Sequence, residues 1–273
     1  MKAVILAAGY GTRFLPATKS VPKEMLPLLD KPAIDFLIEE LVASGIRDIL
    51  LVTSRRKKAL EDHLDREIEL EKVLAGRPEK SRKIVPPKAR FFFTRQMQMR
   101  GTGHALLQAR PFIGSEPFIV AYPDDIHVGR PPLTAQLVER HRETGCAVLA
   151  TLHEPPNMHR YALLELDADG EHVRSIVEKP PKGSEPSAEA SIGRYLYLPE
   201  IFEYLEEGYE SHTEGEYYHT YAVNRLAADG KVVFQRVEGR RYDLGTPDSY
   251  LEAFADYIKG FPEYAEILKR KVR

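Results

Sequence analysis

The stretch Val4-Ile5-Leu6-Ala7-Ala8-Gly9-Tyr10-Gly11-Thr12-Arg13 decides how this chain folds. Its apolar first half predicts a short buried strand, and the two glycines predict a sharp turn directly after that strand. Glycines allow the backbone of a turn to approach a ligand closely and to direct N–H groups at it. Arg13 and, ten residues later, Lys23 add positive charge beside the turn. Together these features predict a loop that binds the phosphates of a triphosphate.

Two common phosphate-binding motifs do not fit this loop. A dinucleotide-binding fingerprint requires a third glycine three residues after the second, and Phe14 occupies that position, which argues against an NAD-binding protein. A P-loop requires Gly-Lys-Ser or Gly-Lys-Thr after a four-residue gap, and the sequence contains neither string. An ordinary turn with an incidental arginine is the simpler alternative. The string Lys23-Glu24-Met25-Leu26-Pro27 behind the loop favours the functional interpretation.

Composition argues against several classes of partner. The chain has 273 residues and a net charge of −2, so it can bury a large core but lacks the basic surplus expected of a protein that binds nucleic acid or an anionic membrane. Its single cysteine excludes an intramolecular disulfide framework and is typical of a reducing compartment. No run approaches the ~20 apolar residues of a membrane-spanning helix, and the first apolar run is too short for a signal peptide. We expect a cytoplasmic protein with small-molecule substrates.

Apolar periodicity predicts alternating strands and helices. Residues 34–42 repeat at helical spacing and end before Gly45, and residues 49–53 form the next apolar run. The other expected elements are strands at 90–94, 118–122 and 147–152 and a helix over 133–144. Alternation of this kind predicts parallel pairing with right-handed crossovers. The expected fold class is therefore α/β, with a doubly wound, mostly parallel sheet.

The pattern changes at about residue 153, where strands become shorter and turns become rich in proline and glycine. Shorter strands are expected at 161–166, 172–177 and 192–197. We interpret 1–273 as a single domain in which residues 1–152 and 153–246 form two halves that share one sheet.

Two other regions carry their own local signals. Thr246-Pro247-Asp248 predicts the start of a C-terminal helical segment, residues 247–273, with Leu251, Phe254 and Ile258 on its apolar face. Residues 54–89 are dense in charge. There we expect a helix over 67–74 and a mobile connection over 77–87.

Residues 1–36 resemble the start of a sugar-1-phosphate nucleotidyltransferase, most closely the bacterial UTP–glucose-1-phosphate uridylyltransferases. The resemblance rests on Gly-x-Gly-Thr-Arg and Lys-Glu-Met-Leu-Pro as quoted above, and it continues in blocks to about Tyr257. It implies a Rossmann-like nucleotidyltransferase fold whose first half binds the nucleotide and whose second half binds the sugar phosphate. Thymidylyltransferases share the first string but usually lack the second. UTP is therefore the implied nucleotide, with dTTP or another specificity as the alternative.

The reaction implied is attack by an oxygen of a sugar-1-phosphate on the α-phosphorus of UTP, which releases pyrophosphate and forms a UDP-sugar. Because this nucleophile is already an anion, the site needs no general base. It must instead align two anions and neutralise charge on the transferred group. Cations and a divalent metal held by carboxylates meet that need. The catalytic candidates are Arg13, Lys23, Asp124 and Lys179.

Two aspartates are candidates for a Mg²⁺ site. Asp124 follows the apolar run 118–122, at the edge where open α/β sheets bind ligands. Asp243 lies just before the expected C-terminal helix, and both positions resemble metal ligands of the family. Two carboxylates together with phosphate oxygens suit Mg²⁺. The adjacent Asp125 is expected to point elsewhere.

The remaining candidates bind the two substrates. Gln96 can offer both a donor and an acceptor to a pyrimidine edge, and Glu24 is near the base by resemblance. The nucleotide-binding candidates are Ala8, Gly9, Gly11, Thr12, Arg13, Lys23, Glu24, Gln96 and Gly101. The sugar-phosphate candidates are Glu178, Lys179 and Gly193, because a carboxylate can accept from sugar hydroxyls and an ammonium can pair with phosphate.

The sugar half departs from the family pattern at three positions. Ala162 stands where a glycine is expected, and Tyr218 and Tyr221 replace an amide and an acid of a family motif. The sugar is therefore open between glucose-1-phosphate and a relative with another hydroxyl pattern.

A catalytically silent regulatory relative is the alternative from another class. Such a protein is expected to lose some of the charged candidates, and all of Arg13, Lys23, Asp124, Lys179 and Asp243 are present. The C-terminal helix and the resemblance also imply a homo-oligomer, a dimer or a tetramer.

Overall fold

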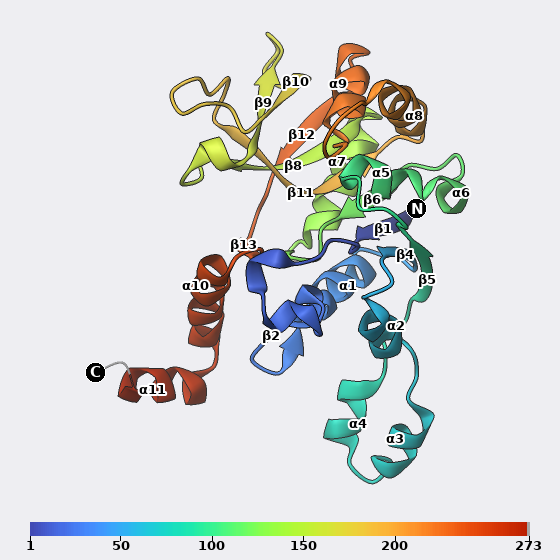
Figure 1. The fold of residues 1–273 in the computed structure, drawn as a ribbon. Helices are drawn as coiled ribbons and strands as arrows, with labels where there is room; N and C mark the ends of the chain where they lie inside the picture. Colours follow the sequence, from blue (N-terminus) through green and yellow to red (C-terminus); the bar gives the residue numbers. More distant parts are fainter. Residues whose placement is uncertain (272–273) are drawn as a thin grey trace.

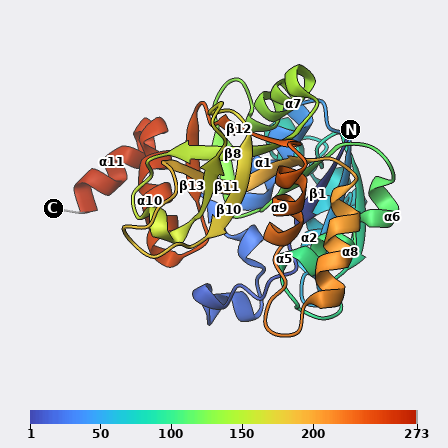
Figure 2. The same cartoon turned by 90° about the horizontal axis from the view of Figure 1, so that it is seen from above.

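Alternate residues of the first strand, β1 (Lys2–Leu6), enter two separate hydrophobic cores. Ala3 and Ile5 belong to one core, and Val4 and Leu6 belong to the other. The helices over the first core are α1 (Ala33–Ala43), α2 (Lys58–Leu64) and α7 (Leu133–Thr144). Those over the second core are α5 (Thr102–Leu107), α6 (Arg110–Ile113), α8 (Ile201–Ser211) and α9 (Thr220–Ala228). The computed structural model, which describes residues 1–271, thus places helices on both faces of one central sheet (Figures 1 and 2).

The central sheet has nine strands and combines a parallel part with an antiparallel part. Its main path runs β10 (Val173–Glu178), β9 (Ala162–Leu166), β11 (Glu189–Tyr197), β6 (Phe118–Ala121), β1, β4 (Asp48–Thr53) and β5 (Arg90–Arg95). Off this path, β8 (Ala147–His153) pairs with β11 and with β12 (Val232–Arg236). Strand β1 is parallel to β4 and β6, β4 is parallel to β5, and β8 is parallel to β12. Strand β11 is antiparallel to β6, β8 and β9 and joins the two parts.

A third core lies beside the sheet under a short two-stranded ribbon. The ribbon pairs β7 (Asp125–Val128) with β13 (Arg240–Asp243), so that Asp125 lies opposite Asp243. Ile126 and Tyr242 of these strands pack with Ala253 of α10 (Pro247–Tyr257). The remaining short elements are β2 (Pro27–Leu28), β3 (Lys31–Pro32) and 3-10 turns at Thr12–Phe14, Ala17–Lys19, Lys23–Met25, Met158–Arg160 and Ile258–Gly260.

The α/β class and the elements expected from periodicity are confirmed. The helix expected over 133–144 has those bounds, and the strands expected in the second half join the same sheet as the first half. Helix α3 (Ile68–Val73) falls within the range expected for it.

Within the connection expected over 77–87, the structure forms a helix that the sequence analysis did not predict, α4 (Pro78–Ile84). Hydrophobic periodicity could not reveal this helix, since it buries no residue and carries no apolar stripe. Helices α3 and α4 project away from the sheet in Figure 1.

The C-terminal segment begins as expected, and two of the three residues expected on its apolar face pack against the protein. The Thr246 side chain accepts from the Ser249 N–H in a capping box, which starts α10. Phe254 packs against the third core and Ile258 is buried, as expected, whereas Leu251 is 66% exposed and the buried residue of the helix is Ala253. Helix α11 (Pro262–Lys271) follows, and residues 272–273 of the predicted segment lie outside the described residues. Among residues 1–271, no helix is long and apolar enough to cross a membrane.

Candidate active site

The glycine-rich loop after β1 presents backbone N–H groups to solvent. Ala8 is buried, whereas Gly9 is exposed at the tip and the exposed Thr12 begins a 3-10 turn. Within the described chain, the N–H groups of residues 8–11 donate to no protein acceptor. Gly11 has a φ of 68°, a left-handed conformation that favours glycine, and its carbonyl accepts from the Thr18 hydroxyl at 2.7 Å. The loop is therefore held in shape while its donors stay available to an anion.

Lys23 and Asp124 meet at the edge of the sheet next to this loop. Lys23 begins a 3-10 turn, Asp124 directly follows the short segment after β6, and Lys23 Nζ lies 2.5 Å from Asp124 Oδ2. Burial is the largest single influence and raises the pKa of Asp124, but the attraction and hydrogen bond of Lys23, a backbone hydrogen bond and the charge of Arg13 together hold that pKa below its usual value. Burial likewise lowers the pKa of Lys23, yet Asp124 and Glu24 raise it overall. Both groups are therefore charged at neutral pH.

The two predicted metal ligands converge on the glycine between β13 and α10. A Cβ placed on Gly245 would lie 2.9 Å from Asp243 Oδ1, 3.2 Å from Asp124 Oδ2 and 3.5 Å from Arg13 Nη1. The Gly245 N–H donates to Asp243 Oδ1 at 2.8 Å, and the Leu244 N–H donates to the Asp124 carbonyl at 2.7 Å. Residues separated by over a hundred positions thus share one small space.

This donor set fits a divalent cation in part. Two carboxylates that converge where Gly245 has no side chain suit Mg²⁺, which prefers oxygen ligands and keeps several positions for phosphate or water. Among residues 1–271 no cluster of three or more acidic, His or Cys side chains could hold a metal on its own. A cation held here would therefore take its other ligands from a substrate or from water.

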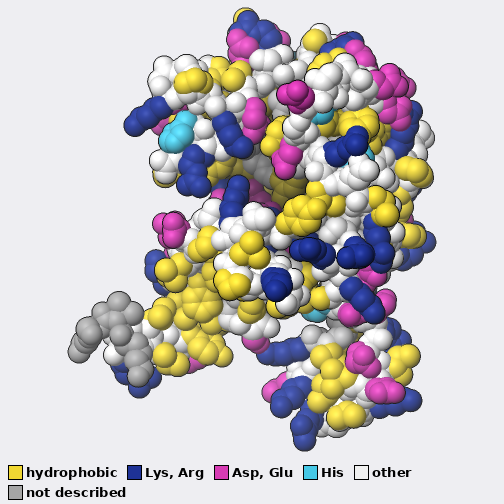
Figure 3. Space-filling view, viewed as in Figure 1, with side chains coloured by type: hydrophobic (Ala, Val, Ile, Leu, Met, Phe, Trp, Pro, Cys, Tyr) yellow, Lys and Arg dark blue, Asp and Glu magenta, His cyan; other side chains and the backbone are white. Residues whose placement is uncertain are grey.

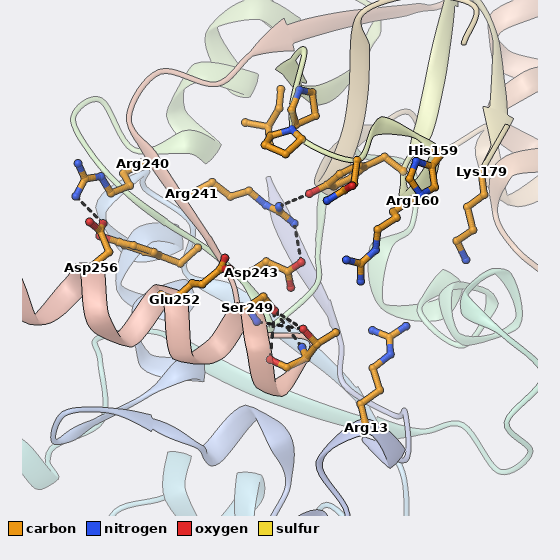
Figure 4. Close-up of a pocket in the computed structure, with 18 of the residues that line it drawn as sticks. Arg13, His159, Arg160, Lys179, Arg240, Arg241, Asp243, Ser249, Glu252 and Asp256 are labelled. Carbon is orange, nitrogen blue, oxygen red and sulfur yellow. Dashed lines mark hydrogen bonds and ion pairs between the residues drawn. The ribbon is translucent and has the colours of Figure 1, made fainter. Parts of the chain in front are cut away.

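A cleft of about 940 Å³ opens beside these residues and is visible as the hollow at the centre of Figure 3. Arg13, Arg160 and Lys179 point into it from three separate elements (Figure 4). Other residues that line the cleft are His159, Tyr161, Arg240, Arg241, Asp243 and Ser249. Most of the charged residues that line the cleft are basic, so the cleft suits an anionic ligand.

The predicted base-binding residues Gln96 and Gly101 lie directly after β5. Gln96 is buried, and its amide nitrogen donates to the Gly101 carbonyl at 2.9 Å and contacts His104 Nδ1 at 3.1 Å. Gly101 has a φ of 95°, and a Cβ there would lie 2.4 Å from the Tyr217 carbonyl oxygen. Glycine is therefore required at position 101, because the backbone of Tyr217 packs directly against it.

Glu24 does not face the cleft. Its carboxylate is buried and accepts from Lys57 Nζ at 2.6 and 2.9 Å. Burial lowers the pKa of Lys57, although Glu24 opposes the shift. Lys57 escaped the sequence analysis because it belongs to a run of four basic residues, which is typical of a solvated surface.

The three sugar-phosphate candidates lie in different surroundings: Lys179 lines the cleft, Glu178 lines a second hollow, and Gly193 is buried in the sheet. Lys179, at the end of β10, has a φ of 45°, which is rare outside glycine, and its N–H donates to the Tyr161 carbonyl at 3.1 Å. Glu178 lines a neighbouring hollow with Tyr218 and Tyr221. Gly193 is buried in β11, where a Cβ would lie 2.6 Å from the Tyr122 ring.

Two basic residues of the cleft were also missed by sequence reasoning. Arg160 immediately precedes the Tyr161-Ala162 departure, so its position beside a family motif was the available signal. Arg241 directly precedes Tyr242-Asp243 but has no motif of its own, and only the pairing of β7 with β13 shows what it contacts.

Comparisons with known proteins show the family to which this chain belongs. The sequence pattern of the nucleotidyl transferase family matches residues 2–260. The UTP–glucose-1-phosphate uridylyltransferase of Staphylococcus epidermidis is 41% identical over 280 aligned positions, covering 100% of this chain and 97% of that protein. A UTP-bound UGPase from Acinetobacter baumannii superposes with a TM-score of 0.87 at 31% identity, covering 99% of this chain and 98% of the other. A UDP-glucose pyrophosphorylase complexed with UDP-glucose gives 0.83 at 35% identity, covering 95% and 98%.

Proposed function

Because this chain belongs to the nucleotidyl transferase family, we propose that it transfers the uridylyl group of UTP to glucose-1-phosphate. The observation that carries the proposal is the gathering of Arg13, Asp124 and Asp243 around Gly245, beside the free N–H groups of the glycine-rich loop. Such a site can align two anions and neutralise charge, which is what this reaction needs. The substrates are those named for relatives that match the chain over nearly its whole length.

In the proposed reaction, an oxygen of the sugar-1-phosphate forms a bond to the α-phosphorus of UTP, and the bond to the β-phosphate oxygen breaks. Pyrophosphate leaves with that electron pair, so no proton has to be abstracted from the nucleophile. The N–H groups of residues 8–11 and Arg13 bind the phosphates of UTP, with Lys23 as a further positive charge at the same edge. Removal of any one of these cations is expected to slow the chemical step.

Asp124 and Asp243 are the proposed Mg²⁺ ligands. When bound, the ion supplies positive charge that offsets the charge on the transferred phosphoryl group. Lys23 keeps Asp124 ionised at neutral pH, and the Gly245 N–H orients the Asp243 carboxylate. Both effects prepare oxygen ligands of the type that Mg²⁺ prefers.

Gln96 is proposed to recognise the base through its amide oxygen. Its amide nitrogen already contacts Gly101 and His104, whereas the oxygen accepts no hydrogen bond from the described residues. A free acceptor suits the N3–H of uracil, which cytosine lacks and thymine shares. Gln96 can therefore separate UTP from CTP but not from dTTP, so thymidylyl transfer is the second candidate. Because both carboxylate oxygens of Glu24 accept from Lys57, Glu24 is proposed to stabilise the structure around the base site and not to contact the base.

Lys179, Glu178 and Gly193 are proposed to bind the sugar phosphate, with residues 153–246 as the sugar-binding half. Lys179 enters the same cleft as Arg13, which supports a phosphate contact. Glu178 shares its hollow of about 320 Å³ with Tyr218 and Tyr221, whose hydroxyl groups donate to nearby glutamates. These tyrosines are where discrimination among sugars would arise.

We also propose that the protein works in the cytoplasm as a homo-oligomer, a dimer or a tetramer. The single cysteine supports a reducing compartment. Leu251, Tyr264 and Ile267 are exposed on the C-terminal helices, where hydrophobic side chains gather in Figure 3. An apolar surface of this kind supports contact with another copy.

Pyrophosphate release tests the function directly. The purified chain is assayed with Mg²⁺, and four nucleoside triphosphates are crossed with a panel of sugar-1-phosphates. Strong turnover of UTP with glucose-1-phosphate is expected, and Asp124→Asn serves as the inactive control. Turnover with another pair alone would contradict the substrates but retain the chemistry. No turnover with any pair would favour the regulatory relative.

A further inference from the structure

Arg241 makes a buried, two-pronged ion pair directly behind the candidate metal site. Its side chain is 12% exposed, and Nε and Nη2 donate to the two carboxylate oxygens of Asp125 at 2.9 Å each. The adjacent Tyr242 packs into the third core, so Arg241 points to the opposite face of the ribbon and lines the cleft. A guanidinium fork that engages both oxygens fixes the orientation of both partners.

Further contacts of this pair reach two residues proposed to act on substrate, Gly193 and Asp243, and also reach Tyr161. Asp125 Oδ2 also accepts from the Gly193 N–H at 3.0 Å. Arg241 Nη2 lies 3.9 Å from Asp243 Oδ2. Arg241 Nη1 donates to the Tyr161 hydroxyl at 3.2 Å, and its guanidinium lies 5.6 Å from the centre of the Tyr161 ring.

Tyr161 links Arg241 to the backbone of Lys179. Its carbonyl accepts the N–H of Lys179, whose backbone has the left-handed conformation described above. Such a conformation is held only where surrounding contacts determine it. Lys179, Gly193 and Asp243 therefore each lie within two contacts of one guanidinium.

We propose that Arg241 is a positioning residue for the sugar-phosphate side of the site. It holds Tyr161 and thereby the backbone of Lys179, and it holds Asp125 and thereby the amide of Gly193. This inference rests on the proposed function, because those residues are given their roles there. Arg241 makes no described hydrogen bond to the glycine-rich loop, to Lys23 or to Gln96, and it only approaches the metal candidate Asp243 at 3.9 Å, so nucleotide binding is expected to change little when Arg241 is replaced.

Two variants test the inference. Tyr161→Phe removes only the hydroxyl that Arg241 contacts, and Arg241→Lys keeps the charge but loses the fork. For both we expect the KM for glucose-1-phosphate to rise about 10- to 100-fold, as is typical when an outer partner of a site is lost, while the KM for UTP stays within about twofold. Calorimetry in EDTA gives a readout without turnover. The dissociation constant of UDP-glucose should rise by a similar factor, and that of UDP should not change.

Arg236→Lys is the matched control. Arg236 also donates to a buried carboxylate, that of Glu189, but it lies outside the cleft. We expect it to lower the thermal midpoint without changing affinity for UDP-glucose. If Tyr161→Phe and Arg241→Lys behave like this control, the pair is only structural and the inference is overturned. Should Arg241→Lys fail to fold, Tyr161→Phe alone decides. A wild-type chain that makes no UDP-glucose would overturn the proposed function and this inference together, whereas an active wild type with unaffected variants overturns only the role of Arg241.

Discussion

Gly245→Ala probes the space that the two candidate metal ligands share. Ordinary contact with a Cβ begins at 3.4 Å, whereas the new methyl group would lie 2.9 Å from Asp243 Oδ1 and 3.2 Å from Asp124 Oδ2. The first oxygen must therefore retreat by about 0.5 Å and the second by about 0.2 Å, and the Gly245–Asp243 hydrogen bond is distorted. Gly245 has no left-handed backbone, so alanine adds no conformational strain. The perturbation is confined to the carboxylates.

Displacements of this size are small for the fold and large for a metal site. Carboxylates at the end of flexible side chains can move at little cost, so the thermal midpoint should fall by less than about 4 °C, which is about 1 kcal/mol for a chain of this size. A ligand moved by about 0.5 Å is expected to weaken Mg²⁺ binding by about 10- to 100-fold, the range typical of disturbed ligand orientation. The concentration of Mg²⁺ needed for half-maximal activity should rise accordingly.

The assay is a Mg²⁺ titration of pyrophosphate release at saturating UTP and glucose-1-phosphate. Gly260→Ala is the matched control, because Gly260 also lacks a left-handed φ and a Cβ there would meet no atom within 4 Å. The control should titrate like the wild type. If Gly245→Ala also titrates like the wild type with unchanged kcat, the reasoning that Asp124 and Asp243 hold one cation is refuted.

Asp124→Asn should lower turnover by at least about 100-fold while the protein stays folded in a thermal melt; near-normal activity would contradict the metal assignment. Lys179→Ala should raise the KM for glucose-1-phosphate by about 10- to 150-fold, which corresponds to the loss of about 1.5–3 kcal/mol for a hydrogen bond to a charged group, and a selective loss of UTP binding would misplace Lys179. Gln96→Ala should reduce the preference for UTP over CTP by about 2- to 12-fold, and an unchanged ratio would mean that the backbone recognises the base. The folded-state pKa of Asp124 is lowered, because Lys23 together with a backbone hydrogen bond and Arg13 outweighs burial, so the ionised carboxylate contributes stability above about pH 4 that is lost as the pH falls through the lowered pKa. Lys23→Met should therefore destabilise the protein to urea at pH 7 but much less at pH 3, and equal effects at both pH values would contradict this linkage.

Local sequence patterns predicted much of this protein. The helix over 133–144 and the strand after Met1 follow from the spacing of apolar residues, because burial of one face imposes a fixed period on nearby positions. The glycine-rich loop was predictable for a similar reason, since a turn and its φ angles depend on a few adjacent residues. Asp124 could be placed at a strand end from the apolar run before it.

Only the tertiary structure showed which charged residues act together. In the sequence, Lys57 is one of four adjacent basic residues and Arg241 is one of two, yet one pairs with buried Glu24 and the other with buried Asp125. The residue type of a charged side chain does not show whether that side chain is solvated or buried, so its ion-pair partner cannot be inferred from its neighbours in the chain.

The pairing of strands that are distant in the sequence was also revealed only by the tertiary structure. The antiparallel pairing of β11 with β6, and of β13 with β7, joins segments about 70 to 115 residues apart in the chain. These pairings bring Asp124 together with Asp243 and Arg241 together with Tyr161. Apolar spacing records which face of a segment is buried but not which distant segment covers it. The loop and the secondary structure were therefore encoded locally, whereas the metal pair and the contacts behind it arose from the packing of strands distant in sequence.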